Sequence, residues 1–157
     1  SRGLGDVYKR QAPVSGELVN LEKTNDPAFS SRAVGDGVAV VPQEGTVCAP
    51  VSGTVAALFP TEHALGIMSD DSSAQVMLHI GIDTVKLEGK GFHALVAQGD
   101  HVDAGQPLVE VDFDVVRAAG FDPTVFVIVC ERSENSTLRE HASGPVAAKE
   151  PVIWLSE

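Results

Sequence analysis

The chain has 157 residues, a length that suits one domain with its own hydrophobic core. Its 22 acidic and 11 basic residues give a formal charge of -11, which repels nucleic acid phosphates and anionic lipid headgroups. No apolar run approaches the ~20 residues of a membrane-spanning helix, and no signal-peptide pattern follows the first residues. We therefore expect a cytoplasmic domain that neither binds nucleic acid nor inserts into a membrane.

The first eleven residues, SRGLGDVYKRQ, show no hydrophobic periodicity. Arg2, Lys9 and Arg10 place three of the eleven basic residues here. We expect residues 1–11 to form a tail or linker outside the fold, and residues 12–157 to form the domain.

A short motif occurs twice in the first third of the chain. The sequence APVSGEL of Ala12–Leu18 recurs as APVSGTV in Ala49–Val55. In each copy proline favours extended backbone, and the Ser-Gly pair favours a tight turn before an apolar strand. The recurrence predicts a duplicated β motif.

Two neighbouring runs predict a β-hairpin. The run QVMLHIGID of Gln75–Asp83 alternates in the way of a half-buried strand, with His79 on the face opposite the aliphatic residues. The run Thr61–Met68 precedes it, and the polar residues of Ser69–Ser73 form the loop between them.

The register of this hairpin decides whether two histidines meet. A loop centred on Asp71 places His63 directly opposite His79, and opposed residues project to the same side with Cβ atoms roughly 4.5–5.5 Å apart. Gly81 leaves space on the same face. A shift of one residue would turn one histidine to the other face. We predict that His63 and His79 share one surface site.

Short strands separated by turns continue to the end of the chain. The run Thr124–Cys130 is β-branched and apolar on both faces, which predicts a central buried strand. Helix is expected only over Phe113–Ala119 and Ser136–His141. The pattern predicts an all-β fold, an antiparallel β-sandwich or barrel-like structure with one or two short helices.

Cys48 and Cys130 are the only cysteines, and both lie in apolar runs. We interpret them as buried free thiols in a reducing compartment, with a disulfide between them as the open alternative.

The segments around the two histidines resemble a known family. The sequence HIGIDTVKLEGKGF of His79–Phe92, TEHA of Thr61–Ala64 and APVSG near the start resemble the glucose-type IIA proteins and domains of the bacterial phosphoenolpyruvate-dependent sugar phosphotransferase system. The likeness extends over nearly the whole chain, from Ala12 to Leu155. It implies an antiparallel β-sandwich built on a duplicated hybrid motif.

The resemblance also implies a function. A IIA chain is a cytoplasmic phosphocarrier, a phosphotransferase component that takes a phosphoryl group from the histidine protein HPr and passes it to the cysteine of a IIB domain during sugar uptake. By match of motif, His79 would carry the phosphoryl group and His63 would be the second active-site histidine. Thr61 and Gly81 match the positions that hydrogen-bond these rings. No cofactor is implied beyond the phosphoryl group, and regulatory proteins are further expected partners.

These residue types suit phosphoryl transfer. The transition state is loose, so the protein must align the reacting atoms and stabilise spread negative charge. A neutral imidazole attacks through one ring nitrogen while the other carries the proton, which a backbone carbonyl enforces by accepting its N–H. We expect the Gly81 carbonyl to hold His79 for attack through Nε2. His63 would donate a hydrogen bond to the phosphoryl oxygens, with Thr61 holding its ring.

Other residues receive lesser roles. A basic partner is expected to supply positive charge, because we interpret Lys86 and Lys90 as solvated surface charges. Asp83 lies roughly 13 Å from His79 along an extended strand, so we interpret it as a turn or interface residue. An apolar rim for partner docking is expected from Phe59, Leu65, Ile67 and Met77, with core packing as the alternative. The histidines interpreted as structural or incidental are His93, His101 and His141.

Two other functions stay open. Paired histidines with a carboxylate bind Zn²⁺ in zinc-dependent hydrolases, although no third ligand is evident here. A zinc ion shared with a partner through His63 and His79 is a weaker form of the same hypothesis. The turn at Gly99–Gly105 resembles turns of biotinyl and lipoyl domains, so a non-catalytic regulatory binding module is the second alternative, although no modifiable lysine is seen at a hairpin tip.

Overall fold

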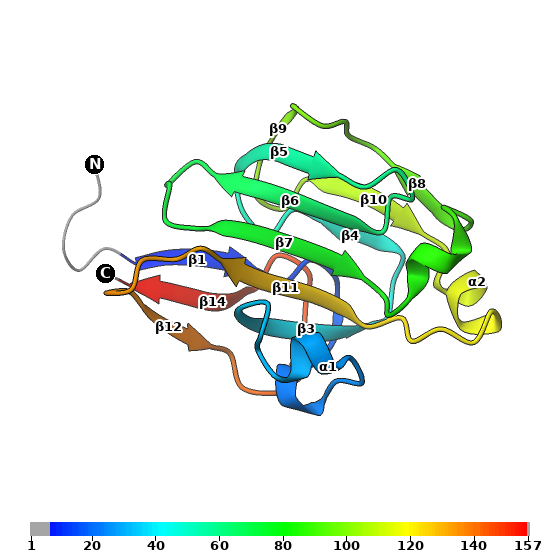
Figure 1. Cartoon of the computed structure of the whole chain (residues 1–157), viewed down its shortest axis with the longest axis horizontal. Coiled ribbons are helices and arrows are strands. Elements are labelled where there is room, and N and C mark those ends of the chain that lie inside the picture. The colour runs from blue at the N-terminus through cyan, green and yellow to red at the C-terminus, as the bar shows by residue number, and fades with distance from the viewer. Residues whose placement is uncertain (1–6, 157) are drawn as a thin grey trace.

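Strands dominate the computed structural model, which describes residues 7–156 (Figure 1). The strands are β1 (Val7–Gln11), β2 (Gly16–Asn20), β3 (Asp36–Pro42), β4 (Thr46–Cys48), β5 (Gly53–Leu58), β6 (Ala64–Ser69), β7 (Gln75–Ile80), β8 (Phe92–Ala94), β9 (His101–Val102), β10 (Pro107–Val111), β11 (Val125–Cys130), β12 (Thr137–Glu140), β13 (Gly144–Val146) and β14 (Pro151–Ser156). The α-helices are α1 (Pro27–Ser30) and α2 (Phe113–Ala118), and the 3-10 turns are η1 (Leu21–Lys23) and η2 (Thr84–Leu87).

Antiparallel pairing joins these strands into three sheets. The large sheet has eight strands in the order β13-β2-β3-β11-β7-β6-β5-β9, and the small sheets are β1-β14-β12 and β4-β10-β8. All the pairings are antiparallel. The all-β antiparallel fold with two short helices, predicted from alternation and turn spacing, is confirmed. Among the described residues, no helix has the length and apolar character needed to cross a membrane.

The large sheet is covered on both faces near its centre. Its inner face shares one core with both small sheets, through buried side chains such as Leu78, Leu108 and Ile153. Its other face carries a second cluster over which the η1–α1 segment packs, with Phe29 and Phe126 as its aromatic members. The strand β11 therefore contributes buried residues to both faces, as its apolar sequence predicts.

The repeated motif has one structural reason. Each copy contains a glycine that begins a strand, Gly16 in β2 and Gly53 in β5. A Cβ atom at Gly16 would overlap the backbone carbonyl of Val41, and one at Gly53 would overlap that of Met68. Both copies thus keep glycine where a neighbouring strand passes against the turn. The two cysteines are free, Cys48 buried and Cys130 half-buried.

The prediction that residues 1–11 form a tail outside the fold is wrong for residues 7–11. Residues 7–11 form β1, which pairs antiparallel with β14; residues 1–6 lie outside the described part of the chain. The pattern was missed because Arg10 occupies the buried position of this strand. A charge in a core position looks like a solvent-facing residue in a hydrophobicity pattern.

The helix expected over Ser136–His141 is also wrong. This segment contains the strand β12, which pairs with the other edge of β14. Its residues alternate between exposed and half-buried. Such an edge strand carries no strong apolar run, so only its long-range partner reveals it.

A partly buried ion pair fixes β1 to the hairpin of β6 and β7. The Arg10 side chain is fully buried, and its guanidinium donates to Asp71 Oδ2 at 3.2 Å and to the Ser73 hydroxyl at 2.5 Å. Burial alone would raise the pKa of Asp71, but hydrogen bonds from Ser73 and Ser69 and the charge of Arg10 lower it below its usual value. The loop between β6 and β7 is therefore held in place by a residue of the N-terminal strand β1.

Replacing this cation is expected to destabilise the fold. Arg10→Ala should reduce the free energy of unfolding by about 3 kcal/mol, because it leaves the Asp71 carboxylate without its buried partner. Urea denaturation measures the change. Lys9→Ala is the matched control, since Lys9 is exposed on the same strand, and it should change stability by less than about 0.5 kcal/mol. Equal stabilities of the two variants would contradict this role of Arg10.

Candidate functional site

Two histidines meet at one end of the β6–β7 hairpin. His79 belongs to β7, and His63 directly precedes β6. Their ring centroids are 5.1 Å apart, and the ring planes are nearly perpendicular at 83°. The prediction that the hairpin brings these two side chains together is confirmed.

The register that produces this contact differs by one residue from the expected one. Ala64 faces His79 in the ladder, and the His63 carbonyl accepts a hydrogen bond from the Ile80 N–H at 2.7 Å. His63 lies before the strand, after Glu62 with a left-handed φ of 63°. Its side chain is therefore not bound to the alternation of β6, and the turn directs it toward His79.

Thr61 holds the ring of His63. The Thr61 Oγ1 atom lies 2.6 Å from His63 Nδ1, within hydrogen-bonding distance. The His63 residue is 3% exposed. Burial, with a smaller effect of the neighbouring His79, lowers the pKa of His63 to about 4. At neutral pH this ring is uncharged.

His79 is half-buried in β7, close to the backbone of Gly81. Burial lowers the pKa of His79, while the Gly81 backbone and the carboxylates of Asp26 and Asp83 oppose that shift. Its Nδ1 atom is buried and makes no hydrogen bond of good geometry within the described chain. Gly81 has φ of 79°, and a Cβ atom there would collide with the Thr84 side chain, so no other residue fits without strain. The backbone around His79 is thus closely defined.

Aromatic rings surround the two imidazoles. Phe29 of α1 lies 5.3 Å from His79 and stacks on Phe126 of β11 at 4.3 Å, centroid to centroid. The ring of Phe59 lies nearly perpendicular to that of His63, with centroids 5.4 Å apart. The sequence prediction did not include Phe29 or Phe126 in the site.

The sequence contains a local signal for the helical turn α1, which carries Phe29. Asp26 followed by Pro27 is a typical helix start, with a capping side chain and a proline in the first turn. The Asp26 carboxylate accepts from the backbone N–H groups of Ala28 and Phe29 at 2.9 and 3.4 Å. The signal predicts a helical turn, but not that this turn packs on His79.

The expected apolar rim is only partly on the surface. Phe59 is 49% exposed and Met77 is half-buried, while Leu65 and Ile67 are buried in the core. Core packing is therefore the role of the latter two. A shallow apolar pocket of about 180 Å³ lies beside the histidines, lined by Ala57, Phe59, Ala64, Leu65, Gly66, Gln75, Val76, Met77 and Cys130.

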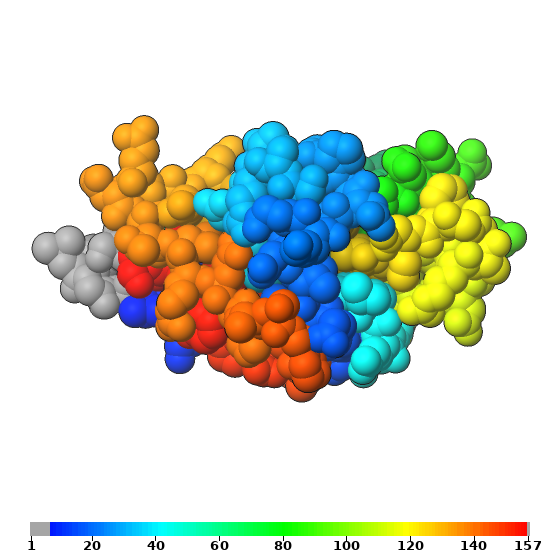
Figure 2. Space-filling view, turned by 90° about the horizontal axis from the view of Figure 1, so that it is seen from below, coloured from blue at the N-terminus to red at the C-terminus, as the bar shows by residue number. Residues whose placement is uncertain are grey.

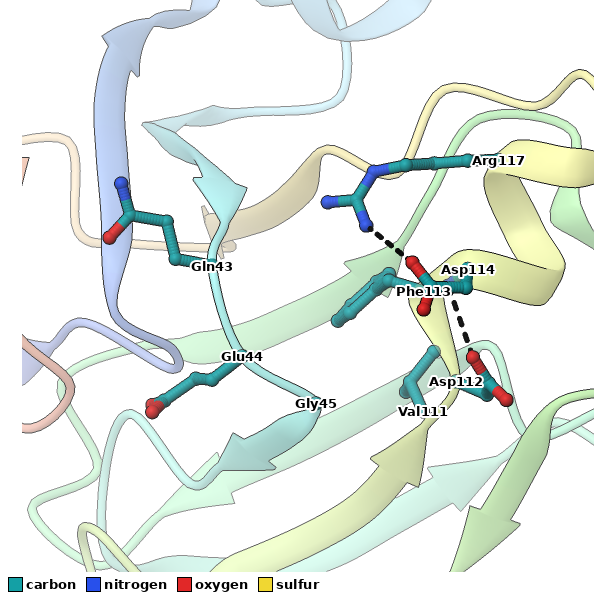
Figure 3. A pocket seen from close by; sticks show the side chains of 8 residues that line it. All are labelled: Gln43, Glu44, Gly45, Val111, Asp112, Phe113, Asp114 and Arg117. Carbon is teal, nitrogen blue, oxygen red and sulfur yellow. Dashed lines mark hydrogen bonds and ion pairs between the residues drawn. The ribbon is translucent and has the colours of Figure 1, made fainter.

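The other polar candidates lie at the surface, and of these Asp83 acts on His79 through its charge. Lys86 and Lys90 are exposed, and Asp83 is exposed at the start of η2. Elsewhere on the surface, the remaining histidines are His93, which is exposed, His101, whose Nε2 lies 2.7 Å from Asp70, and His141, whose Nε2 lies 3.2 Å from Glu150. A separate pocket of about 350 Å³, with Arg117 and Asp114 on one wall, contains none of the site residues (Figure 3).

Metal ligands do not gather in this site. Within residues 7–156, no group of three or more histidine, cysteine, aspartate or glutamate side chains could hold a metal ion. His63 and His79 alone offer two ligands, fewer than the three protein ligands of a catalytic zinc site. The zinc hypothesis therefore has no support in this geometry.

Residues 9–135 match the family described as phosphoenolpyruvate-dependent sugar phosphotransferase system, EIIA 1. The chain belongs to this family. This EIIA chain is 44% identical over 138 residues to the PTS system beta-glucoside-specific EIIBCA component of Halalkalibacterium halodurans, covering 88% of the chain and 22% of that protein. It is 43% identical over 137 residues to the PTS system glucose-specific EIICBA component of Streptococcus pneumoniae, covering 87% of the chain and 19% of that protein.

The EIIA fold is shared as well. The structure is similar to that of glucose permease IIA from Mycoplasma capricolum, with a TM-score of 0.87, 34% sequence identity, and coverage of 98% of this chain and 99% of that one. The chain thus spans about a fifth of the length of its fused relatives, but nearly all of this IIA structure. The resemblance based on the His79–Phe92 motif is confirmed. EIIA membership makes the chain a phosphotransferase component and disfavours the hydrolase and binding-module alternatives.

The histidine environments predict distinct titrations. In an NMR titration, His63 should change its shifts with a midpoint near pH 4, because burial excludes its charged form. Exposed His101, next to Asp70, should titrate above its usual 6.5 and serves as the internal control. A His63 midpoint at or above that of His101 would contradict the buried, neutral ring.

The same shift should affect stability. Below pH 6.5 the unfolded chain takes up a proton at His63 that the folded chain takes up only near pH 4. The free energy of unfolding is therefore expected to fall as pH decreases from 6.5 to about 4. His63→Gln should weaken this dependence in urea titrations over that range.

Proposed function

We propose that the chain is a phosphocarrier that accepts a phosphoryl group from HPr on His79 and passes it to the cysteine of a IIB domain during sugar uptake. The contact between His63 and His79, with ring centroids 5.1 Å apart inside the family's motif, carries this proposal. Two imidazoles at this spacing can act on a single phosphoryl group, one as nucleophile and one as hydrogen-bond donor.

His79 is the proposed nucleophile. Its Nδ1 is buried near the Gly81 backbone, so a proton on Nδ1 leaves the lone pair of Nε2 free to attack. In the reaction, the bond from Nε2 to phosphorus forms as the bond from phosphorus to the donor's histidine breaks. Burial supports this step, because a lowered pKa keeps the imidazole uncharged and nucleophilic at neutral pH.

His63 is the proposed donor to the phosphoryl oxygens. When the Thr61 hydroxyl donates to Nδ1, the ring proton of neutral His63 resides on Nε2. Nε2–H then donates to an equatorial oxygen as negative charge spreads over the phosphoryl group. Thr61 acts by fixing this tautomer and the ring orientation.

Positive charge is expected to come from the protein partners. The side chains whose charges act on His79 include the carboxylates of Asp26 and Asp83, and the whole chain carries a formal charge of -11. A partner with a basic patch would be steered to this face and would supply the cations that phosphoryl transfer needs. Exposed Phe59 and half-buried Met77 give the same face an apolar rim for docking.

The relatives support a IIB domain as the acceptor. Their names, EIIBCA and EIICBA component, describe B, C and A parts in one chain, and the present chain matches only one part of that length. HPr as donor, a cytoplasmic location and regulatory proteins that bind the same rim follow from the family role and belong to the proposal. The proposed mechanism uses no cofactor besides the phosphoryl group that is transferred.

Replacing each histidine should separate the two roles. With phosphoenolpyruvate, the general phosphotransfer proteins and a IIB domain, His79→Ala should take up no phosphate. His63→Ala should take up phosphate but donate it poorly to the IIB domain. Radiolabelled transfer measures both steps, and His101→Ala, exposed elsewhere on the surface, is the control. Phosphorylation of His79→Ala to the level of the unmodified chain would overturn the proposal.

Thr61→Val should slow transfer without abolishing it. The substitution keeps the shape of the side chain and removes the hydrogen bond to His63, which is worth about 0.5–1.5 kcal/mol and hence roughly 2- to 10-fold in rate. Single-turnover transfer to the IIB domain measures the effect. In the His63→Ala background Thr61→Val should have little further effect, because it acts through that ring.

A further inference from the structure

Arg32 binds three carboxylates at once. Its Nε donates to Glu22 at 2.6 Å, and its Nη1 donates to Asp36 at 3.1 Å. Nη1 and Nη2 bind the two oxygens of Glu140 at 2.7 and 3.0 Å, which is the bidentate geometry of strong arginine–carboxylate pairs. The hydrogen bonds to Glu140, Glu22 and Asp36 raise the pKa of Arg32 despite its burial.

The three carboxylates belong to different parts of the fold. Glu22 lies in η1, Asp36 begins β3 of the large sheet, and Glu140 ends β12 of a small sheet. Figure 2 shows the blue η1–α1 region packed beside the orange segment that contains β12. A second guanidinium, that of Arg132, binds the other oxygen of Asp36 at 3.1 Å. We call these five side chains the Arg32 cluster; it joins the η1–α1 segment to the large sheet and to the β1-β14-β12 sheet.

The backbone of Arg32 also shapes the end of α1. Its φ of 61° is left-handed, a conformation that residues with a Cβ atom adopt only where the surroundings hold it. Its N–H donates to the Phe29 carbonyl at 3.0 Å. The side chain and the backbone of Arg32 therefore act on the same turn.

This turn has little stability of its own. The helix α1 has four residues, Pro27–Ser30, too few to persist without tertiary contacts. Phe29, 5% exposed, forms its contact with the sheet and lies 5.3 Å from the ring of His79. Asp26, which caps the helix, is one of the carboxylates that act on His79. The position of α1 thus sets one wall of the site.

From these contacts we infer that Arg32 is a positioning residue for phosphoryl transfer at His79. It anchors the α1 turn so that Phe29 stays packed on the imidazole and keeps water from that side of it, while Arg32 itself touches neither histidine. The inference rests on the proposed function, because it concerns a residue that supports the same site. It also defines a side reaction: water that reaches phosphorylated His79 attacks phosphorus, the N–P bond breaks, inorganic phosphate leaves and His79 is regenerated.

The test removes the charge and keeps the length of the side chain. Arg32→Met should remain folded by circular dichroism. Its phosphorylated form should release phosphate to water faster than that of the unmodified chain, and transfer from phosphorylated HPr should fall about tenfold, because a misplaced wall disturbs alignment. The NMR titration midpoint of His79 should rise toward 6.5, since burial is the largest influence that lowers it. The other groups that act on this ring are the Gly81 backbone, the carboxylates of Asp26 and Asp83, and the neighbouring ring of His63.

Arg117→Met is the matched control. Arg117 is also a partly exposed arginine, with an ion pair of 3.6 Å to Asp114 and a hydrogen bond to the Pro42 carbonyl, but it lies in the pocket of Figure 3, which contains no site residue. Its hydrolysis rate and His79 midpoint should equal those of the unmodified chain. Phe29→Ala should reproduce the effects of Arg32→Met, and the double variant should be no worse than either single one, because Arg32 acts through Phe29.

Each outcome decides the inference. A folded Arg32→Met protein with unchanged hydrolysis and an unchanged His79 midpoint overturns it, as does strict additivity with Phe29→Ala. Should Arg32→Met not fold, Arg32→Lys replaces it, since one ammonium cannot bind Glu140 in a bidentate way. An unchanged hydrolysis rate and an unchanged His79 midpoint in Arg32→Lys would then overturn the inference. If the unmodified chain takes up no phosphate at His79, the proposed function itself fails, which is a separate result.

Discussion

Two uncharged imidazoles in contact are the constraint on which the rest of this structure depends. Burial lowers the pKa of both His63 and His79, and the two rings lie at right angles with centroids 5.1 Å apart. Such an arrangement needs a rigid frame. β11 and β5 flank the hairpin within the sheet, Arg10 is bound to its loop, and Phe29 closes the side of His79. These contacts together fix the positions of the His63 and His79 rings.

The features that follow from local pattern could be predicted from the sequence. Alternation with a period of two identified β7 and the hairpin, and a continuous apolar run identified the buried β11. The meeting of His63 and His79 was predicted although the register is shifted by one residue. The predicted contact is correct despite that shift, because His63 lies in the turn before β6, where the direction of a side chain does not follow strand alternation.

The features that depend on distant partners could not be predicted. Arg10 can be buried because it pairs with Asp71, which lies 61 positions away in the sequence. Arg32 likewise pairs with Glu140, which is 108 positions away. A charged residue has the same local appearance whether its partner is a distant carboxylate or water. The sequence prediction also did not include the helical turn that follows Asp26, and no local pattern indicates the contact of Phe29 with His79. The walls of the site are therefore a property of the tertiary structure.

The neutrality of His63 has a consequence for the energetics of a relay. Before transfer, the buried ring of His63, with its pKa near 4, offers an incoming phosphoryl group a hydrogen bond without a net charge, whereas a charged donor would bind it as an ion pair. In the proposed reaction, a donor that approaches without net charge binds the phosphoryl group less tightly than a cation would, which favours its release from His79 to an acceptor.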